Sequence, residues 1–250
     1  MSNAAARADN LYLAAPYDYA EVRRLILTGA LPPGSRLAQY DLADTLGMSI
    51  TPLREAFRRL SGEGLIDLDT FRNARVAAIS ATEARQLHEV RLSLEVTAAG
   101  LAAGRRTDAD IAAMHAAADA LLPVTRQGGE AALSAHRAFH RSLYLASHNE
   151  VLVRLLEDLW DKSDRYRRLG LDLPAGEEPR DRDRSQHHRM LELVVAGEQA
   201  DVAALVRRHI GSSLAASAIQ ALEAGEGIAA TSRSSASCPG SGPRRQPTDG

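Results

Sequence analysis

The chain has 250 residues, of which 45% are hydrophobic and 25% are charged, and its formal net charge is −2 at pH 7. This is the composition of a soluble globular protein with room for two domains, and the near-neutral charge argues against indiscriminate electrostatic binding to nucleic acid. The single cysteine, Cys238, rules out an internal disulfide framework, and the lack of an 18-residue apolar run or a secretory leader pattern predicts a cytoplasmic protein without membrane contact.

The N-terminal third is predicted to form three helices and a β-hairpin. Helix-forming residues dominate the chain, whereas Thr, Ile and aromatic residues are few, so a mainly α fold is expected. After a frayed segment over residues 1–15, the pattern predicts helices over about 17–28 and 39–46 and a third helix after Gly47. Residues 65–68 and 74–79 read as two short strands of a hairpin. This order indicates a winged helix-turn-helix domain over residues 16–80.

The third helix has the pattern of a DNA-reading helix. Gly47 can adopt the left-handed conformation that ends the preceding helix, and Ser49 or Thr51 can cap the next one. Apolar residues then recur with the i, i+3, i+4, i+7 spacing of a helix that packs on one face: Leu53, Ala56, Phe57 and Leu60. Arg54 and Arg58 point away from that face, toward the space that DNA would occupy.

The residues that we expect to contact DNA lie on this exposed side and on the wing. Arg54 is the candidate for a bidentate contact to guanine, because a guanidinium matches the two acceptors of that base. The complete predicted set is Ser49, Thr51, Arg54, Arg58, Arg72 and Arg75. The alternative is a helical hairpin with solvated arginines, since residues 1–80 hold nine Arg against nine acidic residues.

From residue 81 to 223 the pattern is helical throughout. Helices are predicted over about 82–104, 107–122, 129–147, 149–170, 181–196 and 199–223, with Gly and Pro at most of the breaks. We expect an all-α bundle that serves as an effector-binding and dimerisation domain. Gly, Ser and Pro dominate the end of the chain, so residues 224–250 are predicted to be a disordered tail.

Four of the eight histidines form a second pattern. His136 and His140 are four residues apart and therefore share one helix face. His187 and His209 lie on later helices and face the predicted core. Imidazoles that converge from several helices suit a divalent ion such as zinc or nickel. Single histidines on helices are more often surface or satisfied core residues, so spacing alone leaves both interpretations open.

The motifs of residues 19–79 together resemble the winged helix-turn-helix of the GntR family of bacterial transcription regulators. The resemblance rests on Pro33-Gly34, Leu42-Ala43, Leu46-Gly47, Thr51-Pro52, Arg54-Glu55-Ala56 and Glu63-Gly64-Leu65. Ile50 stands where the family usually has an arginine that contacts DNA. This departure implies a changed operator sequence rather than a loss of DNA binding.

Residues 83–213 resemble the all-helical FCD effector domain of the FadR subfamily. The landmarks are Glu89-Val90-Arg91, Phe139-His140, Asn149 and Gly197-Glu198. Many members bind a divalent metal through one aspartate and three histidines. In this resemblance, His140, His187 and His209 occupy the three histidine positions of the family, and His136 occupies the aspartate position. It therefore implies an all-imidazole site, which suits zinc or nickel better than harder ions.

In that subfamily a small organic acid often binds beside the metal. Arg91 matches a family arginine that faces the cavity, and its guanidinium could pair with a carboxylate. Glu95 and Arg165 are the other effector-binding candidates. An ordinary helix-surface arginine is the alternative interpretation of Arg91.

Together the two halves predict a ligand-responsive DNA-binding transcriptional regulator rather than an enzyme. Such a protein is expected to bind a palindromic operator in double-stranded DNA as a homodimer. Two alternatives remain at this stage. The ion itself could be the effector of a metal-sensing regulator, or the histidines could activate water in a metal-dependent hydrolase. The hydrolase is less favoured, because the sequence offers no clear general base.

Overall fold

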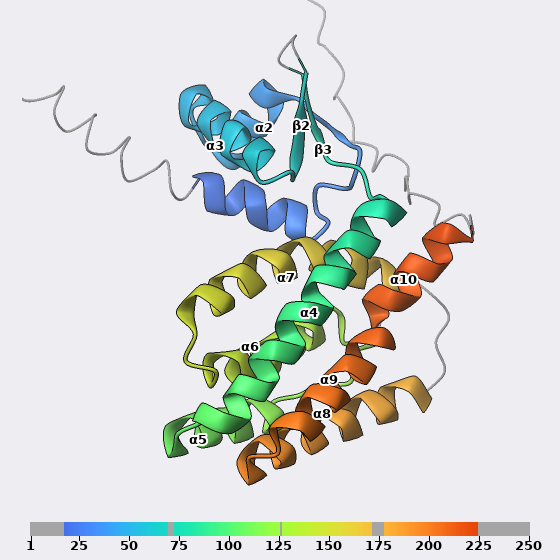
Figure 1. Cartoon of the computed structure of the whole chain (residues 1–250). Helices are drawn as coiled ribbons and strands as arrows, with labels where there is room; N and C mark the ends of the chain where they lie inside the picture. The colour runs from blue at the N-terminus through green and yellow to red at the C-terminus, as the bar shows by residue number, and fades with distance from the viewer. Residues whose placement is uncertain (1–17, 70–72, 126, 172–177, 225–250) are drawn as a thin grey trace, which may run out of the picture.

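The computed structural model describes residues 18–69, 73–125, 127–171 and 178–224 (Figure 1). A small winged domain lies at one end of a larger bundle of helices, and α4 runs from the winged domain down the length of the bundle. This arrangement confirms the mainly α fold class, with an N-terminal winged helix-turn-helix and a C-terminal helical bundle. The segment 1–15, predicted to be frayed, and residues 225–250 of the predicted tail lie outside the described residues.

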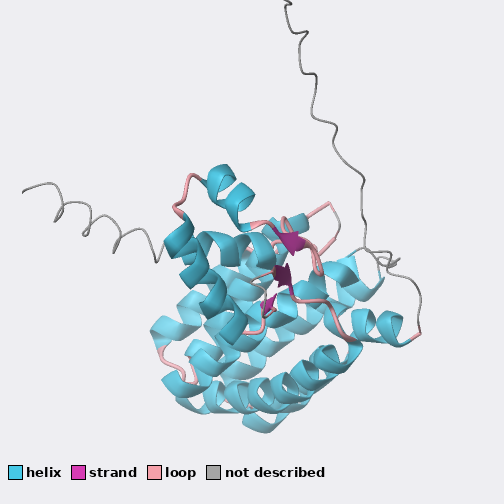
Figure 2. Ribbon diagram, turned by 90° about the horizontal axis from the view of Figure 1, so that it is seen from above, coloured by secondary structure: helices cyan, strands magenta, loops and turns pink. Residues whose placement is uncertain are grey.

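The winged domain contains a first helix over residues 18–27, α2 (Gln39–Leu46) and α3 (Ile50–Gly62). Its antiparallel sheet has the order β1-β3-β2, built from β1 (Arg36–Leu37), β2 (Ile66–Leu68) and β3 (Ala74–Val76). Figure 2 shows these strands from above, among the surrounding helices. The sequence pattern does not predict β1, because two residues are too few to show alternation. The last strand ends at Val76 rather than at residue 79.

Packing of α3 follows the predicted spacing. Leu53 and Leu60 are fully buried, and Ala56 and Phe57 are each 1% exposed. Gly47 ends α2 with a φ of 65°, a left-handed conformation that glycine adopts without strain. Burial of one face of α3 against the first helix and the sheet fixes the opposite face toward solvent.

The bundle contains seven helices among the described residues. They are α4 (Ala81–Arg105), α5 (Asp108–Asp119), α6 (Gly129–Leu145), α7 (Glu150–Leu171), α8 (Glu178–Ala196), α9 (Gln199–Gly211) and α10 (Leu214–Glu223). The small side chains of Ala98, Ala99, Ala102 and Ala103 on α4 are fully buried and let neighbouring helices approach closely. In the part of the chain that the structure describes, no helix is long and apolar enough to cross a membrane.

The largest difference from the predicted helices lies at the end of the bundle. The sequence pattern predicts a single helix over residues 199–223, but the chain breaks into α9 and α10 at Ser212 and Ser213. The Ser213 side chain accepts a hydrogen bond from the Ala216 N–H and so caps the start of α10. The break follows from this local cap, which the apolar periodicity on both sides conceals.

Candidate functional site

The exposed start of α3 presents two of the predicted DNA-contacting hydroxyl groups. Ser49 occupies the N-cap position, yet its side chain makes no capping hydrogen bond. The third residue of the helix is Pro52, which has no N–H to offer to a capping oxygen. Ser49 and Thr51 are both exposed at the start of α3, so the structure leaves both predicted contact residues accessible from solvent.

Arg54 is held in place by α2. Its Nε donates to Gln39 Oε1 at 3.2 Å, and its Nη2 donates to the Tyr40 hydroxyl at 3.4 Å. Gln39 therefore orients the guanidinium through Nε, and Nη2 lies toward the exposed Tyr40. By contrast, Arg58 is well exposed and pairs with Glu55, three residues earlier on the same helix, at 3.0 Å.

The wing adds a basic residue that the sequence analysis missed. Arg36 on β1 lies directly opposite Arg75 on β3, and both side chains are exposed. Arg36 donates to Asn73 Oδ1 at 3.3 Å, and Arg75 donates to the Gly34 carbonyl at 3.2 Å. Like charges directly opposite in a sheet repel each other, so this pair is suited to an anion such as a phosphate. Arg72, the other predicted wing contact, lies outside the described residues.

A surface hollow joins the wing to the start of α3. Arg36, Gln39, Tyr40, Arg54 and Asn73 are among the residues that line it. Of these residues, the sequence pattern singles out only Arg54 as a DNA contact. The pairing of β1 with β3 brings Arg36 to this surface, and no local sequence signal marks that pairing.

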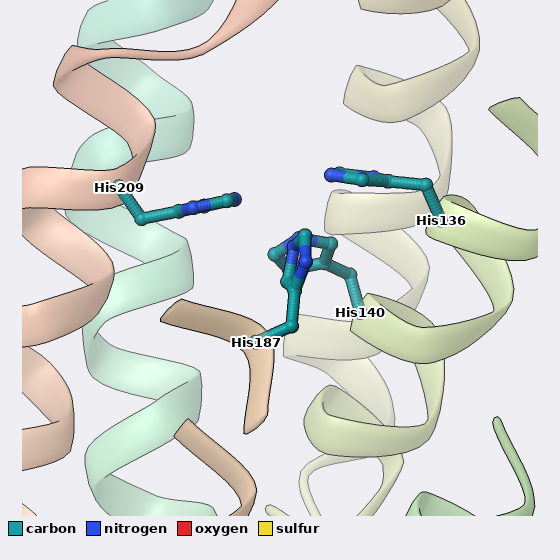
Figure 3. A group of neighbouring side chains, drawn as sticks. All are labelled: His136, His140, His187 and His209. Carbon is teal, nitrogen blue, oxygen red and sulfur yellow. The ribbon is translucent and has the colours of Figure 1, made fainter. Parts of the chain in front are cut away.

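The four predicted histidines converge inside the bundle (Figure 3). His136 and His140 come from α6, His187 from α8 and His209 from α9. Each is at most 7% exposed, and one nitrogen from each lies within 4.8 Å of those of the others. Nε2 of His140 lies 3.1 Å from Nε2 of His187. Two nitrogen ligands of a tetrahedral zinc ion, each about 2.0–2.1 Å from it, would lie about 3.3 Å apart.

Tyr144 sets the orientation of His140. The tyrosine hydroxyl donates its proton to Glu95, and Nδ1 of His140 lies 3.1 Å from the same hydroxyl. Burial, reinforced by the charge of Glu95, raises the pKa of Tyr144 well above the ordinary value, so this hydroxyl keeps its proton. The hydroxyl can then only accept from His140, which places the imidazole proton on Nδ1. The Nε2 lone pair faces the other imidazoles, as a metal ligand requires.

Two residues of α8 lie next to the outer ring nitrogens of His187 and His209. Nδ1 of His209 lies 3.0 Å from Gln186 Oε1 and 3.5 Å from an oxygen of Asp183. Nδ1 of His187 lies 3.7 Å from the other Asp183 oxygen. The Gln186 oxygen favours the proton on Nδ1 of His209. The Asp183 carboxylate lies beyond hydrogen-bond distance of His187 and favours a proton on its Nδ1 only by electrostatic attraction; protons on both Nδ1 atoms would leave both Nε2 atoms for a metal. Neither residue was predicted from the sequence, although Asp183 lies four residues before His187 and therefore on the same helix face, whereas Gln186, one residue before it, points about 100° away.

His136 differs from the other three. The Arg167 side chain donates from Nη2 to Nδ1 of His136 over 2.9 Å, since a guanidinium can only donate. The neutral imidazole of His136 therefore carries its proton on Nε2, which lies 3.8 Å from Asp183 Oδ2. In this arrangement His136 offers no lone pair to the centre of the group.

The environment favours neutral imidazoles. Burial lowers the pKa of His136, His140 and His187 well below the ordinary value, and nearby positive groups such as Arg167 lower it further. Neutral imidazole is the form that binds a metal. The donor chemistry and the outward protons of His140, His187 and His209 thus fit a zinc- or nickel-like ion.

The predicted effector residues separate into two places. Arg91 and Glu95 are buried beside the histidines and form an ion pair of 2.6 Å. Arg165 is not part of this group: its Nη2 donates to the Ala77 carbonyl, at the junction with the winged domain. Arg167 lies beside the histidines instead. The Arg91 and Arg167 guanidinium carbons lie 4.4 and 4.9 Å from the ring centre of Trp160.

Two family models match the chain. "Bacterial regulatory proteins, gntR family" matches residues 19–75, and "FCD domain" matches residues 86–212. The Nta operon transcriptional regulator of Aminobacter aminovorans is 31% identical over 181 residues, which cover 71% of this chain and 82% of that protein. The HTH-type transcriptional regulator McbR of Escherichia coli K12 is 30% identical over 141 residues, or 56% of this chain and 64% of McbR.

Solved structures show the same fold. E. coli McbR/YncC superposes with a TM-score of 0.69 at 23% identity, covering 84% of this chain and 97% of that one. A GntR regulator from Rhodococcus sp. RHA1 superposes with a TM-score of 0.65 at 20% identity, covering 83% of this chain and 98% of that one. The sequence matches to the first curated relatives span less than two thirds of their length, 64% for McbR.

The fold and the two family models define a bacterial regulatory protein with an FCD domain, which is a class of regulators rather than enzymes. The chain belongs to the GntR family. This confirms the family expected from the sequence, and the FCD domain agrees with the FadR subfamily.

Proposed function

We propose that this chain is a DNA-binding transcriptional regulator controlled by a small organic acid that binds beside a divalent metal ion in the helical domain. The observation that carries this proposal is the buried group of four histidines within 4.8 Å of one another, beside two buried arginines. The regulator would act as a cytoplasmic homodimer on a palindromic operator, with α3 in the major groove of each half-site.

His140, His187 and His209 would hold the ion through Nε2. Such an ion supplies a fixed positive charge that can bind an anionic ligand. Tyr144, Gln186 and Asp183 contribute by fixing the orientation of the rings. His136 is the fourth candidate ligand, and it can join only after Arg167 releases its Nδ1 and the proton leaves Nε2.

Arg91 and Arg167 are the residues that would recognise a carboxylate. Both are buried against Trp160. An acid that brings two or more oxygens to this place would share the two guanidinium groups with Glu95 and Asp164.

The DNA-binding half rests on Ser49, Thr51 and Arg54 at the start of α3 and on Arg75 at the wing. Arg36 joins this set because it faces the same hollow. Arg58 would contact phosphate after leaving its exposed pair with Glu55, an exchange that costs little at the surface.

A thermal-unfolding screen tests the proposal. Chelator-treated full-length protein is heated with zinc or nickel, with a panel of organic acids, and with both together. A ligand that binds only the folded state raises the melting temperature with its concentration. We expect stabilisation by the metal, further stabilisation by an acid only when metal is present, and neither effect in the His140→Ala His187→Ala variant. Equal metal stabilisation of that variant would place the site elsewhere.

A second candidate function is a metal sensor in which the ion alone is the effector. It is favoured by the pairing of both buried arginines with carboxylates, Arg91 with Glu95 and Arg167 with Asp164. An incoming acid must compete with these pairs. To separate the candidates, DNA that the protein selects from a random pool is titrated with and without metal and acid. A change of affinity with metal alone supports the sensor.

A further inference from the structure

A chain of ion pairs begins at the histidine group. Arg167 donates from Nη2 to His136 Nδ1 at 2.9 Å and pairs through Nη1 with Asp164 Oδ1, also at 2.9 Å. The second oxygen of Asp164 lies 3.2 Å from Nη1 of Arg137. Arg137 also pairs with Asp161. Opposite charges therefore alternate from the histidines to the surface of the bundle that faces the winged domain.

The same chain continues across the domain junction. Asp161 Oδ1 accepts from Arg137, whereas Oδ2 accepts from Arg23 of the first helix. Nε of Arg23 lies 3.1 Å from Glu63 Oε2, and the Tyr19 hydroxyl donates to the other oxygen of Glu63. Glu63 is the C-cap residue of α3. The contacts thus join the histidine group to the end of the helix that carries the DNA-reading residues.

Burial makes these pairs stronger than ordinary surface pairs. The side chains of Arg167, Asp164 and Asp161 are 4%, 11% and 15% exposed, and those of Arg23 and Glu63 are 22% and 33% exposed. Solvent screens such groups less than it screens fully exposed ones. Loss of one partner would leave the next group partly buried and unpaired, which is unfavourable. Displacement of one charged side chain therefore changes the stability of the next ion pair in the chain.

Helix α7 carries the members that connect the two domains. Asp161, Asp164 and Arg167 are three residues apart along it, so they form one stripe. Arg165 of the same helix donates to the Ala77 carbonyl just after β3. A single rigid element therefore touches the histidine group, the first helix and the segment that follows the wing.

We propose that this chain of ion pairs transmits metal occupancy of the histidine group to α3, and that Asp161 is the member of the chain that pairs with the winged domain. The inference rests on the proposed metal site. For His136 to become a ligand through Nε2, its proton must move to Nδ1, where it would face the N–H of Arg167. Two donors cannot share a hydrogen bond, so Arg167 must leave His136 and shift its contact with Asp164.

The test uses hydrogen exchange in the full-length protein, with and without zinc. The variant Asp161→Asn removes the junction charge and keeps the side-chain shape. Asp158→Asn is the matched control, because Asp158 lies on the same helix and is exposed. Zinc is expected to change exchange by at least threefold in residues 18–27 and 59–63 of the wild type and of Asp158→Asn. In Asp161→Asn the zinc effect should stay within α6, α8 and α9.

Two results would overturn the proposal. One is a zinc effect in residues 18–27 of Asp161→Asn equal to that of the wild type. The other is a wild-type effect confined to α6, α8 and α9. Arg23→Gln, which removes the same junction pair from the other side, should reproduce Asp161→Asn and guards against a folding defect in either variant.

Failure of the metal site itself would look different, because zinc would leave exchange of α6, α8 and α9 unchanged in every variant. In that case, coupling along the ion-pair chain is measured in metal-free protein by a double-mutant cycle. Arg167→Gln and Arg23→Gln are combined, and the shifts of the urea midpoint are compared. Non-additive shifts support the chain, and shifts that simply add overturn it.

Discussion

Replacing Tyr144 by phenylalanine removes one hydroxyl group from the buried support of His140 and leaves the ring in place. Tyr144, Glu95 and His140 are 3%, 0% and 1% exposed, so water cannot easily replace the lost contacts. A hydrogen bond to a carboxylate contributes about 1.5–3 kcal/mol, and an orphaned buried donor costs about 1–3 kcal/mol. Because such contributions are not additive, we expect a loss of about 3 kcal/mol in the free energy of unfolding. For a chain of this size, that corresponds to about 6–12 °C in melting temperature.

The same variant should also weaken metal binding. Loss of a partner that orients a ligating histidine typically lowers metal affinity by about 10–100-fold. The affinity is measured by competition between the protein and a zinc chelator of known strength.

Tyr166→Phe is the matched control for this measurement. The Tyr166 hydroxyl donates to Glu83 and accepts from the Ser80 N–H, among residues of α4 and α10 rather than beside the histidines. This variant should lose stability and keep the wild-type zinc affinity. A zinc affinity of Tyr144→Phe within twofold of the wild type would show that the hydroxyl does not orient His140 for metal binding.

Three further predictions concern DNA binding and pH. Arg54→Ala should weaken binding to the selected DNA by about 1–3 kcal/mol in an anisotropy titration, with a smaller loss for Arg58→Ala; equal losses would refute the specific role of Arg54. Arg36→Ala should weaken binding to all sequences and reduce the slope of log affinity against log salt by about one, whereas an unchanged slope would exclude a phosphate contact. Metal-free protein should lose stability as the pH falls below about 6.5, because burial holds the pKa of His136, His140 and His187 below that of the unfolded chain. Because the unfolded state then binds more protons, the free energy of unfolding measured with urea should change by up to about 4 kcal/mol per pH unit for three such histidines. The same slope in the His140→Ala His187→Ala variant would contradict this assignment.

Local signals determined much of the winged domain. Leu53 and Phe57 were placed in its core by helical spacing alone, and Gly47 ends α2 because its backbone can adopt a positive φ. These features depend on residues within one or two turns of each other. The strand β1 could not be predicted in this way, since its pairing with β3 joins residues that are 39 positions apart in the register of Arg36 with Arg75.

For the histidine group, the sequence supplied the four rings but not their roles. Spacing and resemblance selected His136, yet only the tertiary structure shows that Arg167 occupies its Nδ1. The same structure separates Arg165 from Arg167. Arg165 and Arg167 are two residues apart, so their side chains leave the helix in directions about 200° apart. One arginine therefore faces the junction and the other faces the histidines. The mixed Arg and Asp residues of this stretch give no apolar stripe that would fix the rotation of α7.

By itself, the sequence determined the family, the order of the helices and the faces that become buried, because these depend on local periodicity and on motifs of short span. The tertiary structure alone decided which charged groups meet. Arg23 and Asp161 are 138 residues apart and come together only through the packing of one domain on the other. A hydrophobic pattern selects the buried face of a helix but not its partner, so the link between the histidine group and α3 appears only in the folded chain.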